Sequence, residues 1–185
     1  QPVFVEVNLS LSQKSIATMQ DKEKQRNYEL AEKLLAEQRF SAAVIAGAVA
    51  TLLAAVAYGI TVATWPIAYG FAAAGVGILI GFSIGLLGRG IAMKFAVAAV
   101  FYTLVGGVLG NFFQVVIHLA RVTGNSPIGI LRNESLSLLV KQATSNVFSI
   151  ALLYWFVAVA AAVFLSKRPL SRSDRLAIGL FKMRE

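Results

Sequence analysis

Four apolar stretches dominate the chain, and they lie at residues 40–66, 67–88, 95–117 and 146–166. Each has 20 or more residues and almost no charge. As helices rising about 1.5 Å per residue, they would cross the roughly 30 Å hydrocarbon layer of a bilayer. None shows the alternating pattern of a membrane β-strand. The pattern predicts an all-α integral membrane protein, a four-transmembrane-helix bundle with spans at about 40–63, 67–88, 95–118 and 146–166.

The segments around these spans carry patterns of their own. Residues 3–11 alternate apolar and polar side chains, which predicts an extended, β-like segment within a cytoplasmic tail over residues 1–20. Residues 21–39 are rich in helix formers and predict a juxtamembrane amphipathic helix. The outer loop 119–145 is apolar but interrupted by charge, so we expect an interfacial or partly re-entrant helix, or a lid over the bundle. Residues 167–185 are interpreted as a basic cytoplasmic tail.

Composition supports a membrane location. The chain has 185 residues, 57% of them hydrophobic and 14% charged, and its mean hydropathy is +0.71, well above that of a soluble domain. The residues near Gln1 contain no short apolar run of the kind that marks a signal peptide, so none is expected in the sequence given. Trp65 and Tyr69 are plausible interface aromatics, whereas Tyr154 and Trp155 lie too deep in their span and are interpreted as packing residues.

Charge predicts the orientation. Fourteen of the 17 Lys and Arg residues lie in the two terminal segments and the 89–94 turn, whereas the outer loop holds the other three. The positive-inside rule then places both termini in the cytoplasm. Basic side chains beside span ends are candidates for contact with anionic lipid. The candidates are Arg89, Lys94, Lys167, Arg168 and Arg172.

Small residues recur at four-residue spacing in three spans, which is a pattern that lets membrane helices approach closely. We expect these stripes to face one another in a tight bundle or oligomer. The candidate packing residues are Gly47, Thr51 and Ala55 in the first span, Gly77, Gly81 and Gly85 in the second, and Gly106 and Gly110 in the third.

One polar constellation stands out in the spans. Asn111, Gln114 and His118 are spaced i, i+3 and i+7, so they share one face of the third span near its outer end. They could hydrogen-bond to neighbouring helices. Alternatively, they could line a small cavity, or bind a lipid headgroup or a quinone.

The residue types that the chain lacks exclude several kinds of functional site. The chain has no Cys and one His, so ligand sets for metal or bis-His haem are missing. The spans hold no Asp or Glu, which argues against a proton relay. We therefore expect no catalytic, cofactor-binding or metal-binding residues. The basic termini flank spans and so suit lipid better than nucleic acid.

Several short runs resemble a known group. Gly75-Val76-Gly77, Leu87-Gly88-Arg89-Gly90-Ile91 and Val105 through Asn111 look like the central signature of an uncharacterised group of small bacterial four-span inner-membrane proteins. Glu37-Gln38-Arg39-Phe40 resembles the lead into their first span. The resemblance implies a four-span bundle in the bacterial cytoplasmic membrane, but it implies no activity.

These patterns favour a non-enzymatic accessory or scaffold subunit of a bacterial inner-membrane complex, which docks through its cytoplasmic termini. Its partners would be the lipid bilayer and other subunits or further copies of itself. The alternative is a homo-oligomeric channel or small-solute facilitator lined by Asn111, Gln114 and His118. A third possibility, a quinone- or lipid-binding enzyme subunit, would require a cavity beside His118.

Overall fold

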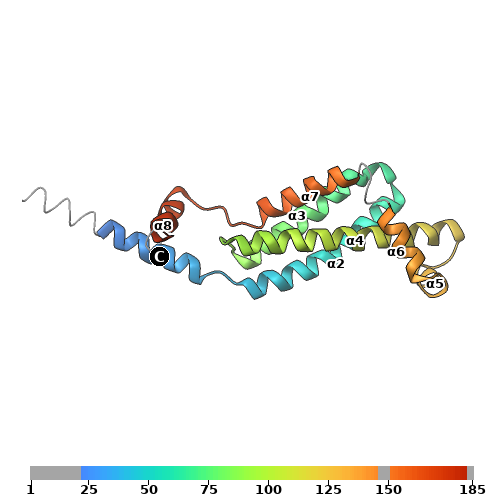
Figure 1. Cartoon of the computed structure of the whole chain (residues 1–185), viewed down its shortest axis with the longest axis horizontal. Coiled ribbons are helices and arrows are strands. Elements are labelled where there is room, and N and C mark those ends of the chain that lie inside the picture. The colour runs from blue at the N-terminus through green and yellow to red at the C-terminus, as the bar shows by residue number, and fades with distance from the viewer. Residues whose placement is uncertain (1–21, 146–150, 183–185) are drawn as a thin grey trace, which may run out of the picture. The chain divides into compact units, whose positions relative to one another are not determined.

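The structure, a computed structural model, describes residues 22–145 and 151–182. Within these ranges every regular element is a helix (Figure 1), as the sequence predicts. The β-like segment predicted at residues 3–11 lies outside them. The chain divides into two compact units, residues 38–168 and the pair of terminal segments 1–37 and 169–185.

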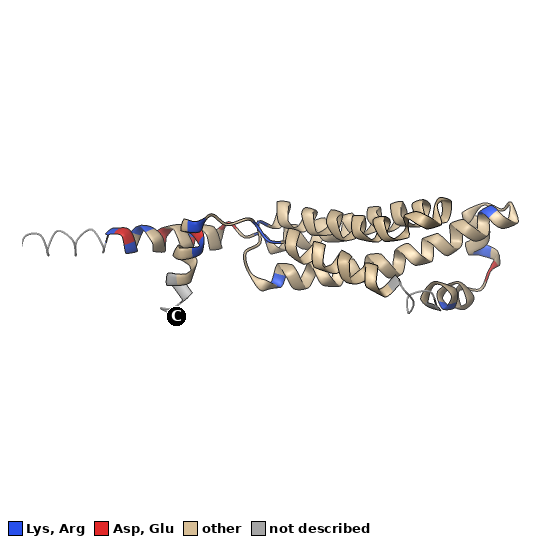
Figure 2. Ribbon diagram, turned by 90° about the horizontal axis from the view of Figure 1, so that it is seen from above, with Lys and Arg blue, Asp and Glu red and all other residues tan. Residues whose placement is uncertain are grey.

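The larger unit is built around four apolar helices. These are α2 (Phe40–Thr64), α3 (Tyr69–Gly88), α4 (Met93–Thr123) and α7 (Ala151–Leu165), with a 3-10 turn, η1 (Pro66–Ala68), leading into α3. Three stretches are long and apolar enough to cross a membrane: α2, α3 together with η1, and α4. Charged residues occur only near the ends of these helices (Figure 2). The prediction of a helical membrane protein is therefore confirmed.

Two boundaries differ from those predicted. The α4 helix continues to Thr123, beyond the predicted end of the third span at 118, because its last turns pack against the outer helices described below. The fourth apolar helix, α7, has 15 described residues, which amount to about 22 Å. Residues 146–150, where the fourth span was predicted to begin, lie outside the described ranges.

The four helices run in two directions. Gly47 packs on Tyr102 and Gly59 packs on Phe113, so α2 and α4 advance together. Gly88 packs on Ala43, so α3 returns in the opposite direction. The helix α7 runs alongside α3 in the same direction, as Figure 1 shows. The parallel pairs are therefore α2 with α4 and α3 with α7, and α3 packs antiparallel to both α2 and α4.

The closest approach in the bundle joins α3 to α7. A Cβ added to Gly81 would lie 2.5 Å from the carbonyl oxygen of Ala162, and one added to Gly77 would overlap the carbonyl of Ala158. Gly85 faces the backbone of Leu165 in the same way. The stripe of the second span therefore faces α7. The sequence led us to expect that this stripe would face the other two small-residue stripes, and it does not.

The reason is that α7 and the residue after it form a small-residue repeat, Ala158, Ala162 and Ser166, and all three are buried. Small residues on both sides let the backbones touch. Gly47 of α2 and Gly110 of α4 instead make room for the rings of Tyr102 and Tyr58, whereas Gly59 of α2 lies against the Cβ and backbone of Phe113 in α4.

Two short helices cover the C-terminal end of α4. Gly124, with φ +72°, ends α4, and the hydroxyl of Ser126 accepts a hydrogen bond of 3.0 Å from the Gly129 amide at the start of α5 (Pro127–Asn133). The helix α6 (Leu136–Ser145) follows. The predicted outer-loop helix is thus a pair of helices. Their buried contact with α4 joins Val115, Val116, Ala120, Ile130, Leu139 and Ala143.

The smaller unit holds a helix over residues 22–36, within the range 21–39 for which the sequence predicts a juxtamembrane amphipathic helix, and α8 (Arg172–Lys182). The C-terminal segment is therefore helical, whereas the sequence was interpreted as a basic tail. Ser171 and Asp174 cap α8: the Ser171 amide donates to the Asp174 carboxylate at 3.1 Å, and the Asp174 amide donates to the Ser171 hydroxyl at 3.2 Å. This reciprocal pair satisfies two amides at the helix start.

The α3–α7 contact generates the first prediction. Gly81→Ala forces the two backbones apart, and overpacking of this kind costs about 1–3 kcal/mol. Gly75→Ala is the matched control, because a Cβ at Gly75 meets nothing within 4 Å. Both changes gain the same helix propensity. Unfolding of both variants in mixed micelles should show G81A less stable than G75A, and equal stabilities would contradict the contact.

Candidate functional site

Polar and aromatic side chains gather in the half of the bundle that holds the C-terminal end of α2. Tyr58 from α2, Tyr69 from α3, Asn111 from α4 and Trp155 from α7 meet there, so each apolar helix contributes one member. Tyr58 and Asn111 are each 2% exposed, and Trp155 is 7% exposed. We call these four residues the aromatic–amide cluster.

Two hydrogen bonds organise the cluster. The Tyr58 hydroxyl donates to the Asn111 side-chain oxygen at 3.0 Å, and the Trp155 indole N–H donates to the Tyr69 hydroxyl at 3.2 Å. The Tyr58 ring meets the Tyr69 ring edge to face at 5.8 Å and the Trp155 ring at 5.5 Å. In hydrocarbon each of these polar groups would be costly without a partner, so the hydrogen bonds tie the helices together.

Glycines on α4 create the space for these rings. A Cβ on Gly107 would lie 3.0 Å from the Trp155 indole, and one on Gly110 would lie 2.6 Å from the Tyr58 ring. Gly110 was predicted to be a helix-packing residue, and the structure gives it an aromatic side chain as its neighbour. Gly106 meets Ile80 and Val76 of α3.

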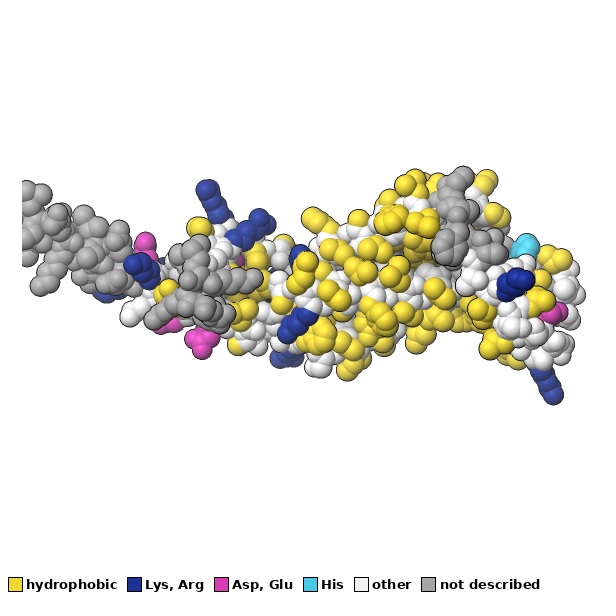
Figure 3. Space-filling model, in the orientation of Figure 1, with side chains coloured by type: hydrophobic (Ala, Val, Ile, Leu, Met, Phe, Trp, Pro, Cys, Tyr) yellow, Lys and Arg dark blue, Asp and Glu magenta, His cyan; other side chains and the backbone are white. Residues whose placement is uncertain are grey.

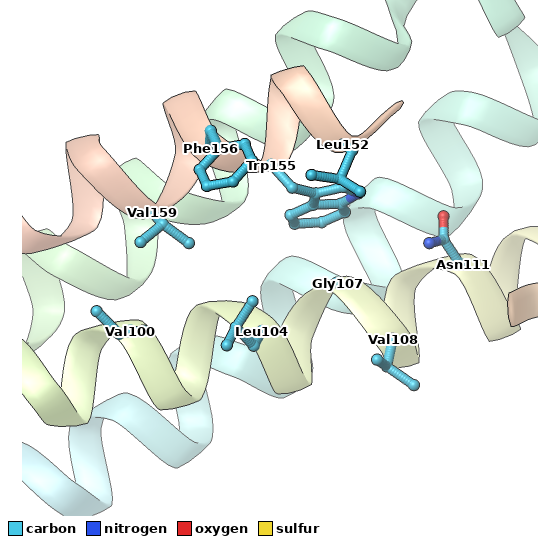
Figure 4. Close-up of a pocket in the computed structure, with 9 residues that line it drawn as sticks. All are labelled: Val100, Leu104, Gly107, Val108, Asn111, Leu152, Trp155, Phe156 and Val159. Atoms are coloured by element: carbon cyan, nitrogen blue, oxygen red, sulfur yellow. The ribbon is translucent and has the colours of Figure 1, made fainter. Parts of the chain in front are cut away.

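Asn111 is only partly satisfied within the cluster. Its side-chain nitrogen is buried and has no hydrogen-bond partner. The residue lies at the end of a groove of about 340 Å³ between α4 and α7. Figure 4 shows the amide nitrogen turned toward the side of the groove on which Trp155 and Leu152 lie. The groove is lined by Val100, Leu104, Gly107, Val108, Asn111, Leu152, Trp155, Phe156 and Val159.

The predicted polar face does not form one site. Gln114 and His118 line a second cavity, of about 260 Å³, with Val62 and Pro66 on one side and Gln142 of α6 on the other. His118 is exposed, whereas Asn111 is enclosed by the bundle. The three residues therefore share a helix face but serve two different cavities.

Basic side chains that the sequence predicts for anionic-lipid contacts lie at the end of the larger unit that holds the 89–94 turn. Arg89, Lys94 and Lys167 are exposed there. The Lys94 ammonium lies 5.3 Å from the Phe40 ring centroid and 5.6 Å from that of Phe95, within cation–π range. Arg89 adopts φ 47° where α3 ends.

The turn between α3 and α4 also accepts backbone hydrogen bonds from the residue before α2 and from a residue after α7. The Arg39 amide donates to the Gly88 carbonyl at 3.0 Å, and the Arg168 amide donates to the Gly90 carbonyl at 2.9 Å. Arg172, the fifth lipid candidate, belongs to the smaller unit.

Sequence reasoning identified Asn111 but missed its partners. Tyr58 lies in the middle of an apolar run, and Tyr69 was assigned to the interface. Tyr154 and Trp155 were assigned to packing without a polar role. The available signal was the presence of hydroxyl and indole groups deep in two spans, since such groups need partners in hydrocarbon.

No family model, curated protein or solved structure matches the chain. The resemblance carried by Gly75-Val76-Gly77 and the Gly106–Asn111 region therefore stays a prediction. In the described part of the chain, no three His, Cys, Asp or Glu side chains come together as metal ligands.

The aromatic–amide cluster generates the second prediction. Tyr58→Phe leaves the buried Asn111 oxygen without its donor, and this loss should cost about 1–3 kcal/mol of bundle stability. Tyr154→Phe is the control, because Tyr154 is 39% exposed and should tolerate the loss of its hydroxyl. Thermal unfolding in detergent measures both. A Y58F variant as stable as Y154F would show that the hydrogen bond contributes nothing.

Proposed function

We propose that the chain is a non-enzymatic accessory or scaffold subunit of a bacterial inner-membrane protein complex, anchored by its helix bundle. The docking part is the smaller unit, built from residues 22–37 and 169–182. The observation that carries this proposal is that both ends of the chain, separated by the whole bundle in sequence, belong to one compact helical unit. Two unstructured tails would offer no such surface.

The smaller unit has the features of a folded docking module. Ala31 and Ala177 are fully buried and Leu34 is 6% exposed, so its helices have packed faces. A polar groove of about 620 Å³ lies on it, lined by Glu23, Arg26, Asn27, Glu29, Leu30, Lys33 and Ser173. Acidic and basic side chains alternate along this groove, which suits a polypeptide partner better than a purely anionic lipid surface.

The larger unit has the features of an anchor. Its outward side chains are apolar over the length of the helices (Figure 3), which suits contact with lipid. Its buried Thr51, Thr103 and Ser166 hydroxyls donate to nearby backbone carbonyls, and Tyr58 donates to Asn111 of another helix. Asn111 is 2% exposed, so it would offer almost no surface to a pore formed between copies. This burial weighs against the channel alternative.

A four-span topology with cytoplasmic termini completes the proposal. The helix α7 follows α3 from Gly77 to Gly85, and beyond it the chain bonds to Gly90. A helix that accompanies a spanning helix over this length crosses much of the same thickness. The excess of Lys and Arg in the terminal segments and the 89–94 turn supports their cytoplasmic location.

Single cysteines can test the topology, because the chain has no Cys of its own. We expect a membrane-impermeant maleimide added to spheroplasts to label Asn125→Cys but neither Ala36→Cys nor Lys167→Cys. All three positions are exposed in the structure. Labelling after lysis shows that each thiol is reactive. Labelling of K167C from outside, with A36C protected, would demonstrate three spans and overturn this part of the proposal.

Docking can be tested with a matched pair of charge insertions. Ala31→Glu buries a carboxylate where the side chain is 0% exposed, so the smaller unit should unfold. Ala36→Glu makes the same substitution at an exposed position of the same helix. After mild-detergent purification from native membranes, native mass spectrometry should find partner subunits with the unaltered chain and A36E, and at least tenfold less with A31E.

Gel filtration serves as the control that the bundle survives in both variants. A chain that purifies without stoichiometric partners, or an A31E variant that keeps them, would overturn the docking proposal.

A further inference from the structure

The groove between α4 and α7 has the features of a ligand site. We propose that it binds an oxidised isoprenoid quinone from the bilayer, with a ring carbonyl accepting a hydrogen bond from the Asn111 side-chain nitrogen. The quinone is held as a bound ligand, and no reaction is assigned to it. This inference does not rest on the docking function, and either can hold without the other.

The state of Asn111 selects the kind of ligand. Its side-chain oxygen already accepts from the Tyr58 hydroxyl at 3.0 Å, whereas its N–H donors are buried and have no partner. An uncompensated amide in an apolar setting is costly, and a carbonyl group offers the acceptor that the site lacks.

The residues that line the groove favour an apolar molecule with a flat ring and a tail. Apart from Asn111, the lining is aliphatic and aromatic, and the indole N–H of Trp155 is engaged with Tyr69. Trp155 provides an aromatic surface between Asn111 and Leu104, and Phe156 provides another farther along, beside Val159 (Figure 4). From Asn111 to Val100 the groove follows α4 for about 16 Å. Its volume of about 340 Å³ is within the range for small-molecule sites.

The opening faces the lipid. Leu104, Val108 and Phe156 line the groove and are 53%, 54% and 66% exposed on the outside of the bundle. A molecule dissolved in the hydrocarbon can therefore enter sideways between α4 and α7. A water-soluble ligand would first have to cross the apolar layer.

Depth distinguishes a quinone from a phospholipid. Asn111 bonds to Tyr58, which precedes the end of α2 at Thr64 by six residues, or about 9 Å. Phospholipid ester groups belong to the polar boundary of the bilayer. A quinone ring lacks a charged headgroup, so its carbonyls can reach this depth.

The test uses the full chain in phosphatidylcholine nanodiscs and decylubiquinone, a quinone with a ten-carbon tail, as the probe. A Trp65→Phe background leaves Trp155 as the single tryptophan, so its quenching reports on the groove. We expect saturable quenching by decylubiquinone. Asn111→Leu should weaken binding about tenfold, because one hydrogen bond is lost.

A second pair of variants guards against misfolding of N111L. The double change Leu104→Phe and Val108→Phe fills the groove at exposed positions and should abolish saturable quenching. The double change Leu153→Phe and Val157→Phe adds the same bulk elsewhere, at positions 65% and 53% exposed, and should leave quenching unchanged.

Three results would overturn the proposal. Quenching could rise linearly without saturation, which is the behaviour of a probe that merely dissolves in the bilayer. The groove-filling pair could bind as well as the control pair. Decylbenzene, which has a ring and tail but no carbonyl, could displace the quinone with equal affinity, and Asn111 would then have no part in recognition.

Discussion

The bundle depends on the direct contact between the backbones of α3 and α7. Lipid tails are as apolar as the helices, so hydrophobicity gives little force for association, and close van der Waals packing has to supply it. Gly77 and Gly81 meet Ala158 and Ala162 with no side chain between them. With 15 described residues, α7 is the shortest of the four apolar helices, and this contact sets its position along α3.

The position of α7 then determines the polar centre. Once Ala158 is seated on Gly77, Trp155 lies one turn away over Gly107 and within hydrogen-bond distance of Tyr69. The Tyr58 ring fills the space between Trp155 and Gly110. The glycines thus have different roles: Gly77 and Gly81 on α3 bring backbones together, whereas Gly107 and Gly110 on α4 accommodate aromatic rings.

The sequence predicts the apolar helices well because length and lack of charge suffice for that. It does not predict which stripes pair, since α7 reads as a uniform apolar run in which Ala158 and Ala162 are inconspicuous. Asn111 and His118 line different cavities because they are about 10 Å apart along α4. This distance leaves room for two separate cavities. The helix α8 was not predicted because the many basic residues of this segment led us to interpret it as a tail, and the capping pair Ser171 and Asp174 was not recognised.

Asn111 links ligand binding to the stability of the bundle. Its oxygen holds Tyr58 in place, whereas its nitrogen remains unpaired at the end of the groove. A leucine there would avoid that cost but would leave the Tyr58 hydroxyl without an acceptor. A carbonyl ligand relieves the remaining penalty without breaking the existing bond. Any such ligand stabilises the folded state by an amount that grows with its concentration relative to its Kd, so occupancy of the groove strengthens the α4–α7 side of the bundle.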